Sequence, residues 1–317
     1  MSISPNSGWR YQDQATNAWS GRRLLDFYVE SYPHSSAEEW RVRIEAGQVL
    51  VNDEPAPAEQ ILQEGQTLSY WRAPWREPPA PLEFGVLYED EDLWIIDKPA
   101  GLPVLPGGNF LENTLLHQLR RRFPQDDPVP VHRLGRGTSG LMLAARSDLA
   151  RRELTEQFRR RRLRKVYWAL VETWDLPDRV ETNQPIGPIP HPQLGQVWGA
   201  DPGGKPAQSS IQVLERLPDR VLLEVAITTG RPHQIRIHLA ALGHPLQGDP
   251  LYELGGLPRA DAVPGQIGYC LQSHHLGFDH PRTGNYQSFS ASAPSWWKAE
   301  ITSSPKTPIL NRNQTSG

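Results

Sequence analysis

A glycine-rich segment in the middle of the chain places the strongest constraint on the fold. Residues 135–140 read Gly-Arg-Gly-Thr-Ser-Gly, which matches the dinucleotide-binding pattern G-x-G-x-x-G. That pattern needs a helix directly after the loop, because the helix N-terminus meets the pyrophosphate. Here residues 141–145, Leu-Met-Leu-Ala-Ala, predict a strand instead. An oxidoreductase that binds a nicotinamide dinucleotide is therefore the least favoured hypothesis, and a test for NAD binding would examine it.

Strands are predicted more often than helices beyond residue 82, and the two do not alternate regularly. Strands are expected within 86–97 and at 166–171, 211–214, 221–227 and 286–291, and helices at 113–123, 149–162 and 233–242. Regular alternation would indicate a doubly wound parallel sheet. The sequence therefore predicts an α+β fold with a mixed, mainly antiparallel sheet.

The first 72 residues predict a smaller, separate unit. Residues 1–18 are polar and are expected to be flexible. In 19–72, Ser36 and Glu39 form a capping-box pattern for a helix over 37–45 that ends before Gly47, and strands follow near 48–54 and 67–71. Four prolines in residues 73–82 predict a linker, 83–302 a second domain, and 303–317 a disordered tail.

Composition excludes several classes of protein. The 317 residues suit about two domains, and no apolar run approaches the ~18 residues of a membrane span. The N-terminus lacks the basic-then-apolar layout of a signal peptide. Cys270 is the sole cysteine, which excludes an internal disulfide and a cysteine-rich zinc site. We therefore expect a cytoplasmic protein that does not enter the membrane.

Positive charge is concentrated in one segment. The net charge is −3, yet residues 151–165 hold eight basic and two acidic side chains, a local charge of +6. Such a cluster in an acidic chain is typical of a confined phosphate-binding face, and a solvated helix face is the alternative. Its candidate RNA contacts are Arg159, Arg160, Arg161, Arg162 and Lys165.

Several motifs, in the same order, resemble those of the RNA pseudouridine synthases. The segment 131–141, Val-His-Arg-Leu-Gly-Arg-Gly-Thr-Ser-Gly-Leu, is similar to the signature loop of the A-type large-subunit ribosomal RNA branch. Segments 165–167, 229–239, 243–252 and 280–284 resemble the motifs that follow it. Residues 19–72 resemble the α-L RNA-binding domain that often precedes such synthases, with an unrelated α/β module as the alternative.

The resemblance implies a fold, a partner and a set of site residues. The family takes a uridine out of folded RNA, detaches the base, rotates it and rejoins it through carbon. By resemblance, Tyr167 stacks on the uracil and assists proton removal at C5, and Arg236 pairs with the catalytic carboxylate. Arg133, Arg136 and Arg231 would contact RNA phosphates. Ribosomal or transfer RNA is the expected partner of a monomer that needs no metal and no organic cofactor.

Other interpretations of these side chains stay open. Tyr167, taken alone, could be a core residue of a strand. His233 and His238 lie five residues apart on an expected helix, so they do not share a face and a metal site is disfavoured. His274 and His275 are expected to belong to the scaffold.

Gly135 is the departure from the family pattern. In the signature loop of the family, the residue after His-Arg-Leu is the catalytic aspartate. A relocated carboxylate from Asp97, Glu156 or Asp249 is one alternative. Two hypotheses follow: an RNA pseudouridine synthase that acts weakly or atypically, and a non-catalytic RNA-binding relative that assists RNA folding or ribosome assembly. Without its carboxylate partner, Arg236 is expected to turn toward phosphate in a wetter, more open pocket.

Overall fold

The chain divides into two compact units, residues 1–78 and 79–317. The computed structural model describes residues 4–172, 175–193, 195–262 and 265–297. The division falls within the proline-rich stretch expected as a linker, and the expected tail 303–317 lies outside the described residues. Among the described helices, none combines the length and the apolar character that crossing a membrane requires.

The smaller unit is an antiparallel sheet with two helices. Its strands, in the order β1-β4-β2-β3, are β1 (Trp9–Gln14), β2 (Val49–Val51), β3 (Glu54–Pro55) and β4 (Thr67–Arg72). A 3-10 turn, η1 (Asn17–Trp19), precedes α1 (Leu24–Ser31) and α2 (Ala37–Glu45). Leu24, Tyr28, Trp40 and Leu68 lie in its core. The helix over 37–45 and its capping box between Ser36 and Glu39 are confirmed.

One expectation for this unit needs correction. The flexible N-terminus expected over 1–18 is wrong for residues 9–14, because β1 pairs along its whole length with β4. The helix α1 begins at Leu24, after Gly21, which has a φ of +82°. The α-L assignment of residues 19–72 stays a prediction.

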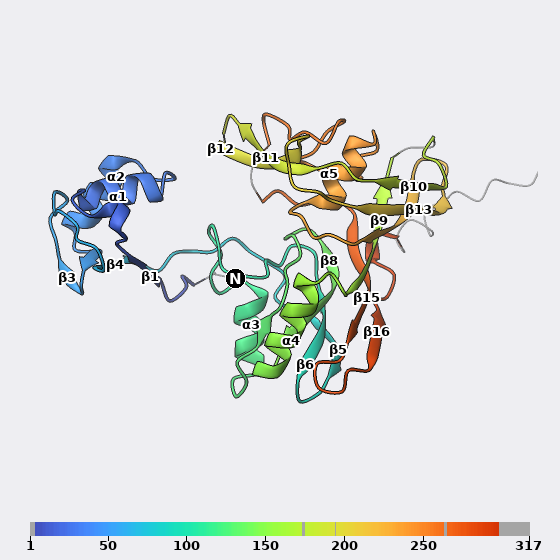
Figure 1. The fold of residues 1–317 in the computed structure, drawn as a ribbon, viewed down its shortest axis with the longest axis horizontal. Coiled ribbons are helices and arrows are strands. Elements are labelled where there is room, and N and C mark those ends of the chain that lie inside the picture. Colours follow the sequence, from blue (N-terminus) through green and yellow to red (C-terminus); the bar gives the residue numbers. More distant parts are fainter. Residues whose placement is uncertain (1–3, 173–174, 194, 263–264, 298–317) are drawn as a thin grey trace, which may run out of the picture. The chain divides into compact units, whose positions relative to one another are not determined.

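The larger unit is built on one mixed sheet (Figure 1). Its order is β10-β13-β14-β9-β15-β8-β6-β5, with β16 beside β15 and β7 beside β8. The strands are β5 (Gly85–Glu89), β6 (Leu93–Lys98), β7 (Val129–Pro130), β8 (Ser139–Ala145), β9 (Arg164–Val171), β10 (Arg179–Thr182), β13 (Ser209–Arg216), β14 (Val221–Ile227), β15 (Leu271–Asp279) and β16 (Tyr286–Ser290). Only the β15–β8 pairing is parallel among those described. A separate hairpin joins β11 (Ile186–His191) and β12 (Gly195–Ala200).

Three helices cover the two faces of this sheet. Alternate residues of β6 and β8 point to opposite faces. One face packs against α3 (Leu115–Arg122) and α5 (Gln234–Ala241), and the other against α4 (Asp148–Arg159). The predicted α+β fold with a mixed, mainly antiparallel sheet is confirmed. Within it, the glycine-rich segment 135–140 leads into β8 and not into a helix, which removes the geometric basis for dinucleotide binding.

The central strand β15 is a feature that sequence reasoning missed. Its middle reads Gln272-Ser273-His274-His275, which lacks the apolar alternation expected of a strand. Tertiary pairing decides its structure, because β9 and β8 flank it on both sides.

Candidate active site

One cavity of the larger unit, of about 510 Å³, unites segments that lie far apart in the sequence. The loop before β8 contributes Arg133 and Gly135, and β9 contributes Tyr167. Arg231 and Arg236 line it from the segment that begins α5. The three residues predicted for catalysis, Gly135, Tyr167 and Arg236, therefore share one cavity.

A buried lysine, Lys98, holds the loop around Gly135 through backbone carbonyl groups. Lys98 donates hydrogen bonds to the carbonyl oxygens of Pro99, Leu102 and Arg136, at 2.8, 2.9 and 3.3 Å. The Gly101 N–H donates to the same Arg136 carbonyl at 2.8 Å. Burial lowers the pKa of Lys98 to about 7. The loop is therefore held by backbone contacts that do not depend on the side chain at 135.

No carboxylate lines the cavity among the residues that the structure describes. Asp97 lies on β6, where burial raises its pKa, and it does not line the cavity. Glu156 lies on α4, where two 2.6 Å hydrogen bonds from Arg159 lower its pKa to about 2. Asp249 lies behind Arg236 with its side chain 1% exposed. None of the three acids considered as substitutes reaches the space beside Gly135.

The expectation for Arg236 is wrong. Arg236 is 5% exposed and binds Asp249 through two hydrogen bonds, Nε–Oδ2 at 2.8 Å and Nη2–Oδ1 at 2.6 Å. Burial lowers the pKa of Arg236, but the Asp249 pair outweighs it, so that the pKa lies above its ordinary value. Asp249 Oδ1 also accepts the backbone N–H groups of Leu251 and Tyr252. A buried cation demands a partner, and Asp249 already supplies it.

Tyr167 lies on β9 between Val225 of β14 and Ser273 of β15. It is 8% exposed and yet lines the cavity. Burial raises its pKa to about 12, opposed by a hydrogen bond with Ser273. The phenol is therefore protonated at neutral pH, which suits stacking and hydrogen-bond donation better than proton removal.

The residues predicted to contact RNA divide into several groups. Arg133 and Arg231 line the cavity, and Arg231 Nε donates to the Pro206 carbonyl at 3.1 Å. Arg136 instead binds the carbonyls of Gly101 and Gly265, at 3.2 and 3.1 Å, and stacks on Phe110. Arg136 therefore contacts three loops, those of Gly101, Phe110 and Gly265, and does not line the cavity.

The basic cluster lies at the end of α4. Arg159 and Arg160 both bind Glu156 with exposed side chains. Arg160 and Arg162 line an open hollow of about 860 Å³ beside the segment 279–284. Arg161 has a φ of +57° where the helix has ended. This face is solvated and partly neutralised by its own acids.

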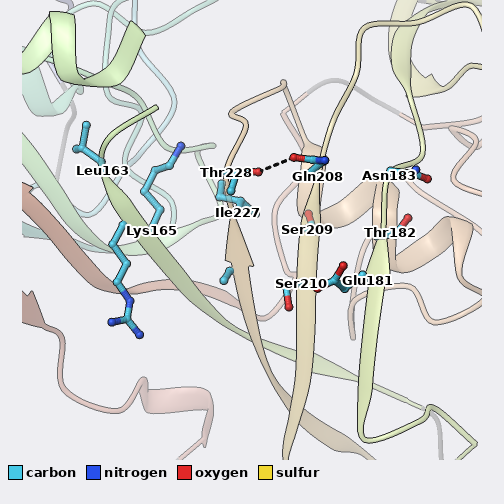
Figure 2. A pocket seen from close by; sticks show the side chains of 12 residues that line it. Leu163, Lys165, Glu181, Thr182, Asn183, Gln208, Ser209, Ser210, Ile227 and Thr228 are labelled. Atoms are coloured by element: carbon cyan, nitrogen blue, oxygen red, sulfur yellow. Dashed lines mark hydrogen bonds between the residues drawn. The ribbon is translucent and has the colours of Figure 1, made fainter. Parts of the chain in front are cut away.

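Lys165 lies in a second hollow, of about 480 Å³, at the ends of strands β9, β10, β13 and β14. Figure 2 shows Lys165 on one side and Glu181, Thr182 and Asn183 on the other, with the ends of β13 and β14 between them. The Thr228 hydroxyl donates to Gln208 Oε1 at 3.2 Å within it. Ile227 lines both this second hollow and the cavity that holds Tyr167, so the two adjoin.

The histidines considered in the sequence belong to the framework of the fold. Burial lowers the pKa of His233 to about 3, and its Nδ1 lies 2.8 Å from the Tyr252 hydroxyl. His238 is fully buried between Ser209 and the Gln184 carbonyl. His274 stacks on Trp168 at 3.9 Å, and His275 contacts Ser290.

One group in the described chain has the composition of a metal site: Asp90, Asp92 and His280. Its oxygens are already engaged, since Arg282 binds Asp92 at 2.7 and 2.8 Å and His280 binds Asp90 at 2.8 Å. This arrangement fits a network that joins the β5–β6 turn to the segment after β15.

Sequence reasoning missed Tyr269, which lines the cavity beside Gly135. It lies 4.2 Å under the Arg236 guanidinium, measured from Cζ to the ring centroid. It precedes β15, the strand that the sequence does not predict. No local pattern marks it, because its place depends on tertiary packing.

The sequence of this chain is similar to those of several known proteins. The sequence model described as RNA pseudouridylate synthase matches residues 92–241. An uncharacterized RNA pseudouridine synthase of Synechocystis is 52% identical, over 86% of this chain and 93% of that protein. The ribosomal large subunit pseudouridine synthase D of Neisseria meningitidis is 32% identical, over 87% and 76%.

A solved human structure supports the fold alone. The RNA pseudouridylate synthase domain-containing protein 4 superposes with a TM-score of 0.54 at 24% identity, over 69% of this chain and 92% of that one. The sequence matches show that the chain belongs to the RNA pseudouridine synthase family.

Proposed function

We propose that this protein binds RNA and seats a uridine in the cavity at Gly135 without the carboxylate-dependent isomerisation of its family. The observation that carries the proposal is a cavity that unites Tyr167, Arg133, Arg231 and Arg236, with no acid among its described lining residues. Ribosomal or transfer RNA is the proposed partner, and a monomer in the cytoplasm is the proposed form.

The chemistry of the cavity explains what would remain and what would be lost. Arg133 and Arg231 can neutralise phosphates, and Tyr167 offers a ring to an unstacked base. Glycosidic cleavage in the family needs a carboxylate, and Gly135 provides none. Removing a nucleophile slows an enzyme by about 10⁶-fold in a well-studied protease. Recognition is therefore expected to persist while isomerisation does not.

Tritium release from C5-labelled uridine in ribosomal and transfer RNA transcripts tests the proposal. We expect the native protein to bind these transcripts and release no tritium above background. Release by the native protein would overturn the proposal, and substitutions at Asp97, Glu156 and Asp249 would then identify the carboxylate.

RNA contact is tested separately by filter binding over a range of salt concentrations. Arg133→Ala and Arg231→Ala should each weaken binding and lower the salt slope by about 1, as the loss of one phosphate contact predicts. Arg179→Ala, on the exposed edge strand β10, is the matched control. Equal effects of all three would mean that RNA does not bind at the cavity.

Catalysis by an unusual route is the second candidate. Arg236 lines the cavity, and Asp249 binds Arg236 through two hydrogen bonds. Relatives across 86–87% of the chain carry synthase names. This candidate requires that the native protein release tritium. Loss of that release in Asp249→Asn would then establish it.

A further inference from the structure

Tyr269 occupies the space beside two glycines of the loop. A Cβ atom placed on Gly135 with ideal geometry would lie 2.9 Å from the Tyr269 hydroxyl oxygen. On Gly137 it would lie 2.8, 2.9 and 3.1 Å from Cε1, Cζ and Oη of the same ring. Real Cβ atoms essentially never approach another heavy atom within 3.0 Å. The ring and any side chain at 135 or 137 therefore compete for one volume.

Other contacts hold Tyr269 in that volume. Its hydroxyl lies 3.3 Å from Thr138 Oγ1, and its ring lies 4.2 Å from the Arg236 guanidinium carbon. Tyr269 is 6% exposed. A cation over an aromatic face in a dry site is stabilising, so the ring also helps to hold Arg236. Displacing Tyr269 would uncover Arg236 and break the contact with Thr138.

We infer that Tyr269 is a positioning residue that takes the place of the absent side chain at 135. Its hydroxyl fills the volume next to Gly135 and its ring supports Arg236, whose charge Asp249 neutralises. A carboxylate at 135 then reaches a working position only when the Tyr269 hydroxyl is also removed. This inference rests on the proposed function, which takes position 135 as the site of the missing carboxylate.

The hydroxyl of Tyr269 makes the close contact at position 135, whereas the ring carbons make the closest contacts at position 137. Of the residues that the structure describes, and apart from the chain neighbours Leu134 and Arg136, only Tyr269 and Thr138 place an atom within 4 Å of the Cβ position at 135, through Oη and Oγ1. Tyr269→Phe therefore clears the contact under 3.0 Å at 135. At 137 the same change leaves Cε1 and Cζ at 2.8 and 2.9 Å. The two glycines thus provide a matched pair that differs in its dependence on one oxygen atom.

The first experiment measures stability and needs neither RNA nor activity. Tm values are taken for Gly135→Ala and Gly137→Ala, each with and without Tyr269→Phe. Overpacking should lower the Tm of both alanine variants by roughly 3 °C or more. Tyr269→Phe should restore the Tm of Gly135→Ala but not that of Gly137→Ala.

Gly107→Ala is the control for a bare glycine substitution. Within the described part of the chain, nothing but its chain neighbours lies within 4 Å of its Cβ position, and its φ is not in the left-handed region. It should show no coupling to Tyr269→Phe. If Tyr269→Phe restored the Tm of both alanine variants equally, or did not restore that of Gly135→Ala, the hydroxyl would not be the group that fills the space beside Gly135.

The second experiment measures catalysis with the same labelled transcripts. We expect Gly135→Asp/Tyr269→Phe to release tritium at least tenfold faster than Gly135→Asp. Equal release by the two variants, or none from the double variant, would overturn the catalytic part of the inference. Release by the native protein would instead overturn the proposed function, while the Tm coupling would stand or fall by itself.

Discussion

Two buried cations lie behind the signature loop, and the protein stabilises them in different ways. Arg236 forms a two-point ion pair with Asp249, and its pKa is raised above the ordinary value. Lys98 binds three carbonyl oxygens, and burial lowers its pKa to about 7. The first cation is permanently charged, whereas the second titrates near neutrality.

The two arrangements together explain how the site stays stable without a carboxylate at position 135. An arginine that depended on a side chain at 135 would be left as an unpaired buried charge, which is strongly unfavourable. Asp249 removes that dependence, because it lies 13 residues from Arg236 in the chain and is fixed by the N–H groups of Leu251 and Tyr252. Lys98 fixes the loop through the Arg136 carbonyl. Neither support involves the side chain at 135.

The largest expected effect comes from breaking the ion pair at its acidic side. Asp249→Ala leaves Arg236 buried without a carboxylate and should lower the free energy of unfolding by about 3–5 kcal/mol. Urea titration measures this change. Glu156→Ala removes the acid from the exposed two-point pair with Arg159 and should cause a much smaller loss. Similar losses in the two variants would mean that the aromatic rings beside Arg236 supply most of its stabilisation.

Replacing the arginine itself has a smaller expected effect. Arg236→Lys keeps the charge, but a single ammonium cannot span both carboxylate oxygens of Asp249. We expect a loss of about 1.5–3 kcal/mol, as for a hydrogen bond to a charged group. Arg159→Lys, at the exposed pair with Glu156, is the matched control and should change the unfolding curve far less. An unchanged curve for Arg236→Lys would show that charge alone matters there.

The sequence predicts most of the framework of this site. Periodicity and capping locate the helices 37–45 and 233–242 to within one residue at each end. The strand after the glycine-rich loop is also predicted, because residues 141–145 are apolar without a helical signal. These features depend on local preference, which a single sequence expresses.

The partners within the site are less accessible to sequence reasoning. The expectation of an open pocket counted the carboxylate lost at 135, and it considered Asp249 as a relocated carboxylate and not as the partner of Arg236. The Gly-Asp-Pro turn contains that acid, but its side-chain direction depends on how the turn packs against α5. Tyr269 is similar, since its ring contacts Gly135, Thr138 and Arg236 only after β15 joins the sheet.

Lys98 gives the smallest expected effect per pH unit, which is a change in the free energy of unfolding with pH. The pKa of its amine falls by burial from 10.5 to about 7 in the folded protein. Between these values the unfolded chain binds a proton that the folded chain does not, so stability should rise with pH above about 7. One proton contributes at most about 1.4 kcal/mol per pH unit. Below pH 7 both states are protonated, and the contribution to the slope vanishes.

Lys98→Met isolates this contribution, because methionine fills a similar volume and does not titrate. Urea titrations at pH 7, 8 and 9 should show a shallower rise for Lys98→Met than for the native protein. Lys205→Met, at an exposed position, should leave the rise unchanged. A native slope equal to that of Lys98→Met would mean that the three carbonyl oxygens keep the ammonium charged when buried. The two buried cations would then be alike in charge and would differ only in their partners.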